Sequence, residues 1–141
     1  MIRRSLREIA DPSRKKEEEE RIWKSFDYKC AYCSKPLRRL RKEGHIDHLL
    51  PASLGGPNHM SNRVLSCATC NEAEKLDGAW QEFILRKNQD PDVVRRRIAR
   101  IREWQKLNGE PLLDKNKLRE IERLSELAAA YYDMRSKKLE N

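Results

Sequence analysis

Two pairs of cysteines, each with the spacing CxxC, constrain the fold of this chain more than any other feature. Cys30 and Cys33 form the first pair, and Cys67 and Cys70 form the second. A CxxC pair presents two thiolates to one ion from a tight turn, and two such pairs complete the closed tetrahedral shell that is typical of structural zinc. We therefore predict one structural Zn²⁺ bound by four cysteines, with residues 34–66 folding between the two pairs.

The rest of the sequence bears on the redox state of these cysteines. Residues 1–16 carry positive charge without an apolar stretch, so we expect no secretory signal. No other segment has the length and apolar character of a membrane span. We therefore expect the protein in a reducing cytoplasm, where disulfides are rare. Redox-active pairs and buried free thiols are the alternatives to a zinc site.

The chain is strongly basic. It has 31 Lys and Arg against 23 Asp and Glu, and its formal net charge is +8. This charge favours a polyanionic partner such as DNA, although a soluble protein can be basic without binding one. One basic group, in the loop after the first CxxC pair, comprises Arg38, Arg39, Arg41 and Lys42, and a second crowds residues 95–102. We favour DNA contact for the first group and leave the second open between DNA contact and a solvated helix face.

Helices are predicted on both sides of the cysteine segment. Asp-Pro pairs at residues 11–12 and 90–91 are typical helix starts, and apolar residues recur at helical spacing after each. The expected helices are 12–27, 70–87 with a break near Gly78, 91–108 and a last helix from Asp114, and the expected strands are 46–50 and 63–66. Side chains expected in the core are Ile22, Trp23, Phe26, Trp80, Val94, Ile98, Ile101, Trp104, Tyr131 and Tyr132.

Residues suited to phosphodiester hydrolysis lie between the cysteine pairs. This reaction needs an activated water and a cation that neutralises charge on the phosphoryl and leaving oxygens. A neutral imidazole such as His48 can take a proton near pH 7, and the carboxylate of Asp47 with an amide oxygen suits a hard ion such as Mg²⁺. On a strand, Asp47 and His48 point to opposite faces, so only a turn or bulge would bring both to one cleft.

Three stretches of this segment, CAYC at 30–33, HIDHLLPASLGG at 45–56 and SNRVLSCATCN at 61–71, resemble the HNH endonuclease family. The resemblance covers about residues 28–75, roughly a third of the chain, and holds the landmarks of the family in order. It implies an α+β fold with a small ββα-metal, treble-clef-like core. It also implies hydrolysis of DNA that leaves 5′-phosphate and 3′-hydroxyl ends.

The resemblance assigns a role to each landmark residue. It makes His48 the general base and Asp47 a ligand of the catalytic metal. Asn62 would tether the loop that orients the base, and Asn71 would be the second protein ligand of the metal. This His-Asn-Asn variant has no imidazole ligand and therefore favours Mg²⁺ over softer ions. Arg63 either contacts a phosphate or is solvated.

Some nearby residues depart from the family pattern or fall outside it. Many members place a lysine three residues after the last landmark, but here Glu74 holds that place and Lys75 follows it. A phosphate-binding role for Lys75 is therefore open. We expect His45 to be structural or exposed, with metal binding or a second base as the alternatives. His59 is expected at the surface.

The predicted organisation is a helical extension at 1–27, an HNH core with the zinc site at 28–89, and a helical region at 90–141 packed on that core. The predicted function is a metal-dependent DNA endonuclease or nickase. The alternative is a zinc-stabilised DNA-binding module without catalysis, while an adaptor built on the helices leaves the landmarks unexplained. One ββα finger makes one cut, so monomer and homodimer both stay open. Small HNH proteins occur in phages, mobile elements and defence systems, so a prokaryotic or phage-infected cytoplasm is the expected setting.

Overall fold

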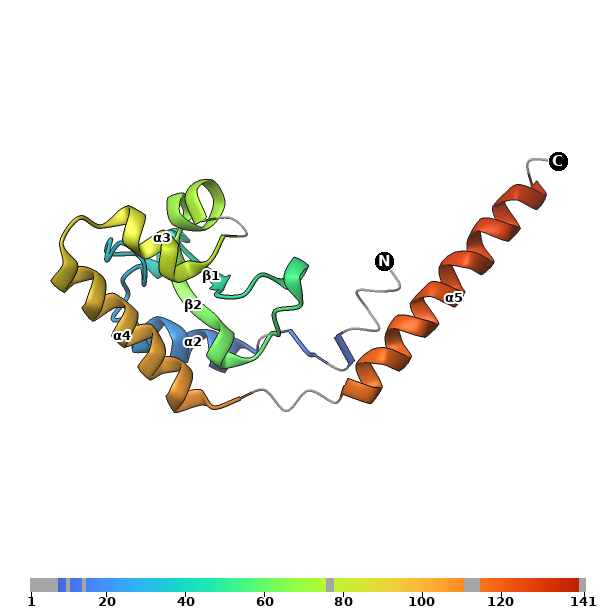
Figure 1. Ribbon diagram of the computed structural model, residues 1–141, viewed down its shortest axis with the longest axis horizontal. Coiled ribbons are helices and arrows are strands. Elements are labelled where there is room, and N and C mark those ends of the chain that lie inside the picture. Colours follow the sequence, from blue (N-terminus) through green and yellow to red (C-terminus); the bar gives the residue numbers. More distant parts are fainter. Residues whose placement is uncertain (1–7, 10, 14, 76–77, 111–114, 140–141) are drawn as a thin grey trace. The chain divides into compact units, whose positions relative to one another are not determined.

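The computed structural model describes residues 8–9, 11–13, 15–75, 78–110 and 115–139 (Figure 1). The chain divides into two compact units, one of residues 14–111 and the other of residues 1–13 together with 112–141. All four cysteines and all three histidines lie in the first unit. This unit mixes helices with a two-stranded antiparallel sheet, which confirms the predicted α+β class. The predicted division at residues 27 and 89 stays a prediction.

The sheet is a ribbon of two strands, β1 (Gly44–His48) and β2 (Arg63–Cys67). The register pairs Gly44 with Cys67 at one end and His48 with Arg63 at the other. Both strands were predicted, but β1 begins two residues earlier than expected and ends at His48. The next amide, that of Leu49, still donates a hydrogen bond of 2.8 Å to the carbonyl of Asn62, so the pairing continues one step past the strand.

Two helices of this unit contact each other through individual side chains. Helix α2 spans Lys16–Ser25, and helix α4 spans Pro91–Asn108. The ring of Phe26, just after α2, meets the ring of Trp104 edge-on with centroids 5.6 Å apart. Both rings are buried together with Ile22 and Trp23, as their helical spacing predicted. The two helices thereby cover one part of the core.

The starts of the two helices follow from local hydrogen bonds. The side chain of Asp90 accepts the amide N–H of Asp92 at 2.8 Å, so α4 starts where the Asp-Pro pair predicted. Helix α2 begins later than the predicted residue 12. The carboxylate of Glu18 accepts the amide N–H of Lys15 at 2.9 Å and so ties down the first turn at that residue.

The segment after the second cysteine pair contains two helical pieces. The first, Thr69–Lys75, is a π-helix, and the second is α3 (Trp80–Lys87). The predicted break near Gly78 is confirmed, since Gly78 and Ala79 are not helical. A π-helix widens each turn by one residue and is frequent at functional sites. Its presence here changes which side chains reach the ribbon.

The second unit contains α5 (Lys115–Leu139). Its predicted cap, Asp114, lies outside the described residues. The prediction that Tyr131 and Tyr132 belong to the core is wrong, because they are 60% and 71% exposed. The described residues of this unit contain no second long helix that could pack against α5 and bury these tyrosines. No described helix is long and apolar enough to cross a membrane.

Candidate metal centre and active site

The four cysteines converge on one point. Their sulfurs all lie within 4.8 Å of one another, and Cys30, Cys67 and Cys70 are buried. A tetrahedral zinc with Zn–S bonds of about 2.3 Å has sulfurs about 3.8 Å apart. The Sγ atoms of Cys33 and Cys67, one from each pair, are 3.8 Å apart. The donor set and its spacing therefore fit the predicted structural zinc.

The protonation of this cluster favours a cation. Hydrogen bonds from Cys33 and then Cys70 lower the pKa of Cys30, which favours the thiolate form of this buried sulfur. The same contact with Cys30 raises the pKa of Cys70, and it raises that of Cys33 to about 11. The thiolate is the form that binds a metal, so Cys30 is already favoured in its metal-binding form.

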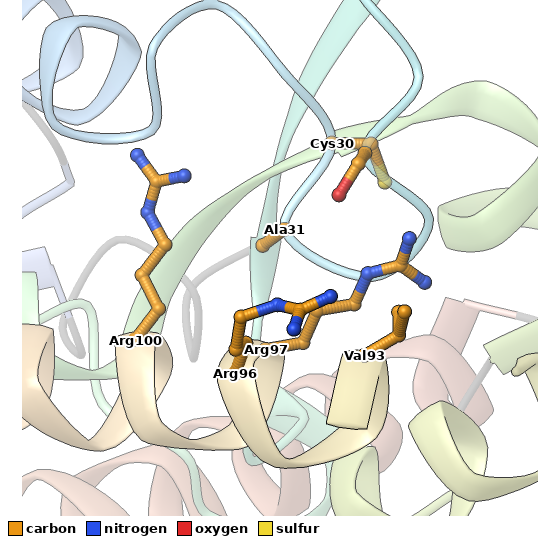
Figure 2. Close-up of a pocket in the computed structure, with 7 residues that line it drawn as sticks. Cys30, Ala31, Val93, Arg96, Arg97 and Arg100 are labelled. Carbon is orange, nitrogen blue, oxygen red and sulfur yellow. The ribbon is translucent and has the colours of Figure 1, made fainter. Parts of the chain in front are cut away.

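An arginine of α4 holds the first CxxC turn in place. The guanidinium of Arg97 donates to the carbonyl of Tyr32 at 2.8 Å and to that of Cys33 at 3.2 Å. Figure 2 shows Arg96, Arg97 and Arg100 projecting from α4 around a pocket of about 320 Å³ beside this turn. A Zn²⁺ held by four thiolates would carry a charge of about −2, which the neighbouring guanidinium groups would offset.

The second basic group, at residues 95–102, therefore also has a structural role. Arg100 donates to the carbonyl of Ser25 and to the carboxylate of Asp27, each at 2.8 Å, and so joins α4 to the end of α2. Arg95 forms an ion pair with Asp92, which lies one turn before it on the same helix. The contacts of Arg97 and Arg100 favour packing over DNA contact for these two side chains, whereas the Arg95–Asp92 pair is exposed and leaves both roles open for Arg95. The pocket of Figure 2 is lined by residues of the CxxC turn and α4, and the HNH landmarks His48, Asn62 and Asn71 do not line it.

Asp47 lies on β1 in a nearly closed environment. It is 9% exposed, and its Oδ2 accepts the hydroxyl of Tyr32 at 2.5 Å. The same oxygen lies 3.1 Å from the ammonium of Lys75. Burial and the adjacent Asp47 charge raise the pKa of Tyr32 well above its usual value, so the phenol stays protonated and donates. Tyr32 belongs to the first CxxC turn, so this hydrogen bond joins the cysteine cluster to the ribbon.

Lys75 ends the π-helix and is only 2% exposed. Its ammonium donates to the carbonyl of His48 at 3.0 Å and lies 5.8 Å from the centre of the Tyr32 ring. The role of Lys75 was open in the sequence. The structure places it in contact with both residues of the Asp47-His48 pair. Asn71 precedes it by four residues on the same π-helix and is partly exposed.

His48 ends β1 and turns its ring toward the following loop. Its Nε2 lies 2.9 Å from the Oδ1 of Asn58, a loop residue that the sequence analysis did not single out. The regular register of the ribbon means that Asp47 and His48 point to opposite faces, as predicted, with no bulge between them. In the sequence, Asn58 is only one more polar residue in a turn-rich loop, so no local signal could have marked it.

Asn62 closes the loop that carries Asn58. Its Oδ1 accepts the amide N–H of Leu50 at 2.8 Å. Its Nδ2 donates to the carbonyls of Leu50 and Pro57, both at 2.9 Å. Three hydrogen bonds from one buried side chain thus join the two ends of the 50–62 loop. This is the geometry that a loop tether requires.

The four arginines predicted to contact DNA differ in exposure. Arg38 is exposed and pairs with Glu43, which raises the pKa of Arg38. Arg41 is exposed, whereas Arg39 is partly covered, pairs with Glu20 and lies over the ring of Trp23.

Arg63 is 2% exposed, and its Nη2 lies 3.1 Å from the carboxylate of Glu18. Its burial does not support the phosphate contact considered for it. Its Nε and Nη1 have no hydrogen-bond partner among the residues that the structure describes.

The two remaining histidines lie near the ribbon. His45 is partly exposed on β1, opposite Ser66. His59 precedes the short 3₁₀ turn Met60–Asn62, and its Nδ1 accepts the amide N–H of Ser61 at 3.2 Å. His59 therefore caps this turn and is only partly exposed.

Comparison with known proteins agrees with the resemblance seen in the sequence. Residues 30–80 match a protein family described as HNH endonuclease. This range contains all four cysteines, the β1–β2 ribbon and the π-helix. No curated protein matches the chain. Residues 30–80 of this chain are therefore similar to the HNH endonuclease family, in a region with a mixed helix-and-strand fold and a four-cysteine cluster compatible with zinc.

Proposed function

We propose that this chain is a metal-dependent endonuclease or nickase that hydrolyses phosphodiester bonds in DNA. In this proposal His48 is the general base, Asp47 and Asn71 bind one Mg²⁺-type ion, and the four cysteines bind a structural zinc. The observation that carries the proposal is that the ring of His48 is held in place by its surroundings, within the segment that matches the HNH family. Its ring is held by Asn58, in a loop that Asn62 closes with three hydrogen bonds.

The contact with Asn58 suits His48 to accept a proton from water. An amide oxygen can only accept, so the Nε2 of His48 donates to the Oδ1 of Asn58. In the neutral ring the other nitrogen, Nδ1, then carries the lone pair. A base held in this tautomer and orientation loses less freedom when it takes the proton. We therefore assign proton removal to the Nδ1 of His48.

The second part of the proposal concerns the catalytic ion. The carboxylate of Asp47 and the amide oxygen of Asn71 are hard donors, which fit Mg²⁺ and do not fit a soft ion. Such an ion, when bound, neutralises charge on the phosphoryl and leaving oxygens. The hydroxyl of Tyr32 fixes the Asp47 carboxylate at 2.5 Å, so the orientation of this donor is set by the protein itself.

The partner in this proposal is the DNA backbone. The net charge of +8 favours binding to phosphates, and binding of this kind carries little sequence information. Arg38 and Arg41 are the exposed arginines of the loop after the first CxxC turn. We assign the phosphate contacts to these two side chains, with Arg39 supporting the loop against Trp23.

Two observations favour the alternative, a zinc-stabilised DNA-binding module without catalysis. The regular register of the ribbon points the side chains of Asp47 and His48 to opposite faces, so the strand alone does not bring them to one cleft. The ammonium of Lys75 already neutralises the Asp47 carboxylate at 3.1 Å, and this contact opposes a second cation on the same group. A plasmid-nicking assay separates the two functions. The endonuclease cuts in Mg²⁺, stops after mild EDTA treatment while its zinc and fold persist, and recovers when Mg²⁺ returns. Retention of DNA without any cutting at high Mg²⁺ would favour the binding module.

A further inference from the structure

The ion pair between Asp47 and Lys75 is the best-buried pair of opposite charges around the ribbon among the described residues. The side chains are 11% and 1% exposed, and the Oδ2 of Asp47 receives both the ammonium of Lys75 and the hydroxyl of Tyr32. The ammonium also donates to a neutral group, the carbonyl of His48. The pair therefore carries no net charge in a site that water reaches poorly.

The π-helix explains how Lys75 reaches this position. It carries Asn71 near its start and Lys75 at its end. The side chains that share a face of a π-helix differ by about one residue from those of an α-helix. The lysine that follows the HNH landmarks stands one place later here than in many family members, and the extra residue per turn accommodates that shift. The same helix thus holds one of the proposed metal ligands and the counter-charge of the other.

We propose that Lys75 is a positioning residue that makes divalent-ion binding at Asp47 depend on DNA. This inference rests on the proposed function. In the free protein the Asp47–Lys75 pair sums to zero, so a divalent ion raises the charge of a poorly hydrated site to +2, which is unfavourable. A phosphodiester bound at the site offers the ammonium of Lys75 a second anionic partner, and as the ammonium shifts toward the phosphate its repulsion of an ion at Asp47 falls. Lys75 therefore weakens ion binding to the free protein more than it weakens ion binding to the DNA complex.

Coupling of this kind has a direct thermodynamic signature. If DNA raises the affinity for the ion by some factor, the ion raises the affinity for DNA by the same factor. A lysine with only a packing role would change the stability of the domain, but it would leave this factor unchanged. If the lysine only contacted the phosphate and did not act on Asp47, its substitution would weaken DNA binding equally with and without the ion. The coupling factor therefore separates these three roles.

The test measures Mn²⁺ binding by electron paramagnetic resonance, with the full chain carrying His48→Ala so that the DNA stays intact. We compare the free protein with its complex with a short duplex. DNA is expected to raise the Mn²⁺ affinity by about tenfold or more. Lys75→Met and Lys75→Gln should each bind Mn²⁺ more tightly when free and show a several-fold smaller gain from DNA. Lys24→Met, which removes the same charge from an exposed site, is the control and should leave the gain unchanged.

Each outcome decides the inference. Lys75→Gln keeps a donor for the His48 carbonyl and Lys75→Met does not, so equal effects of both variants support the charge as the cause. Weaker Mn²⁺ binding by the free variants, or an unchanged gain from DNA, would overturn the inference. If neither variant keeps its zinc and fold, NMR of the lysine ammonium groups in the protein with native Lys75 decides: a change of the Lys75 signal when the duplex binds supports the inference, and an unchanged signal contradicts it. Nicking by the wild type at saturating Mg²⁺ tests the proposed function separately.

Discussion

Replacing Asn62 by alanine tests how the loop behind His48 is held. The substitution removes the three hydrogen bonds that Asn62 makes with the backbone of Leu50 and Pro57, at 2.8 to 2.9 Å. Each such bond contributes about 0.5–1.5 kcal/mol to stability, and a buried group left without its partner costs about as much again. Asn62 is 7% exposed, but Leu50 is 47% exposed, so water can replace some of these hydrogen bonds. We expect the free energy of unfolding to fall by about 2 kcal/mol.

The measurement is thermal unfolding of the zinc-loaded protein, together with the nicking rate. For a unit of this size a decrease of about 2 kcal/mol lowers the Tm by roughly 8–16 °C. Nicking should fall as well, because the loop that holds the His48 ring through Asn58 is no longer closed. Ser53→Ala, at an exposed position in the same loop, should change neither quantity. An Asn62→Ala protein with an unchanged Tm would refute the assignment of Asn62 as the tether.

Three further perturbations probe the zinc site, the buried ion pair and the DNA path. Cys67→Ser should release the zinc and unfold the domain, so an unchanged zinc content and melting curve would contradict a structural role. Glu18→Gln should lower the free energy of unfolding in urea by about 1–2 kcal/mol, because the buried charge of Arg63 loses its counter-charge. The loss is moderate because Glu18 itself is partly exposed to water. Partial burial raises the pKa of Glu18, but hydrogen bonds from Lys15 and Arg63 outweigh the effect of burial and lower the pKa below 4.5. The ion pair therefore stabilises the fold at neutral pH, and this stabilisation is lost as the pH falls through the lowered pKa of Glu18. Neutralising Arg38 and Arg41 should flatten the salt dependence of DNA binding by about one unit for each phosphate that is no longer neutralised, and an unchanged slope would place the DNA path elsewhere.

Local chemistry made part of the structure predictable from sequence. The CxxC spacing fixes two sulfurs within one turn, so the convergence of all four needed only a fold that closes residues 34–66. The two strands were expected at 46–50 and 63–66, and strand periodicity alone placed Asp47 and His48 on opposite faces. The capped start of α4 followed from its Asp-Pro pair.

Contacts between distant segments were beyond the same reasoning. Placing Lys75 against Asp47 depends on the wider turn of a π-helix, and sequence periodicity does not distinguish that turn from a regular helix. Arg63 could be solvated or bound to phosphate on sequence grounds, but its burial depends on Glu18, 45 residues earlier. The clamp of Arg97 on the first CxxC turn likewise joins segments far apart in the chain. Tertiary packing decided each of these positions.

The measurement that tests the central claim most directly is plasmid nicking in Mg²⁺ by His48→Ala beside His45→Ala. If His48 removes the proton from water, His48→Ala should lower the nicking rate by at least about 10²–10⁴-fold while zinc content and DNA affinity stay unchanged. Added Mg²⁺ should not rescue it, because the missing function is proton removal. His45→Ala, at a partly exposed position on the same strand, should keep its activity. An active His48→Ala protein beside an inactive His45→Ala protein would contradict the account and move the base to His45.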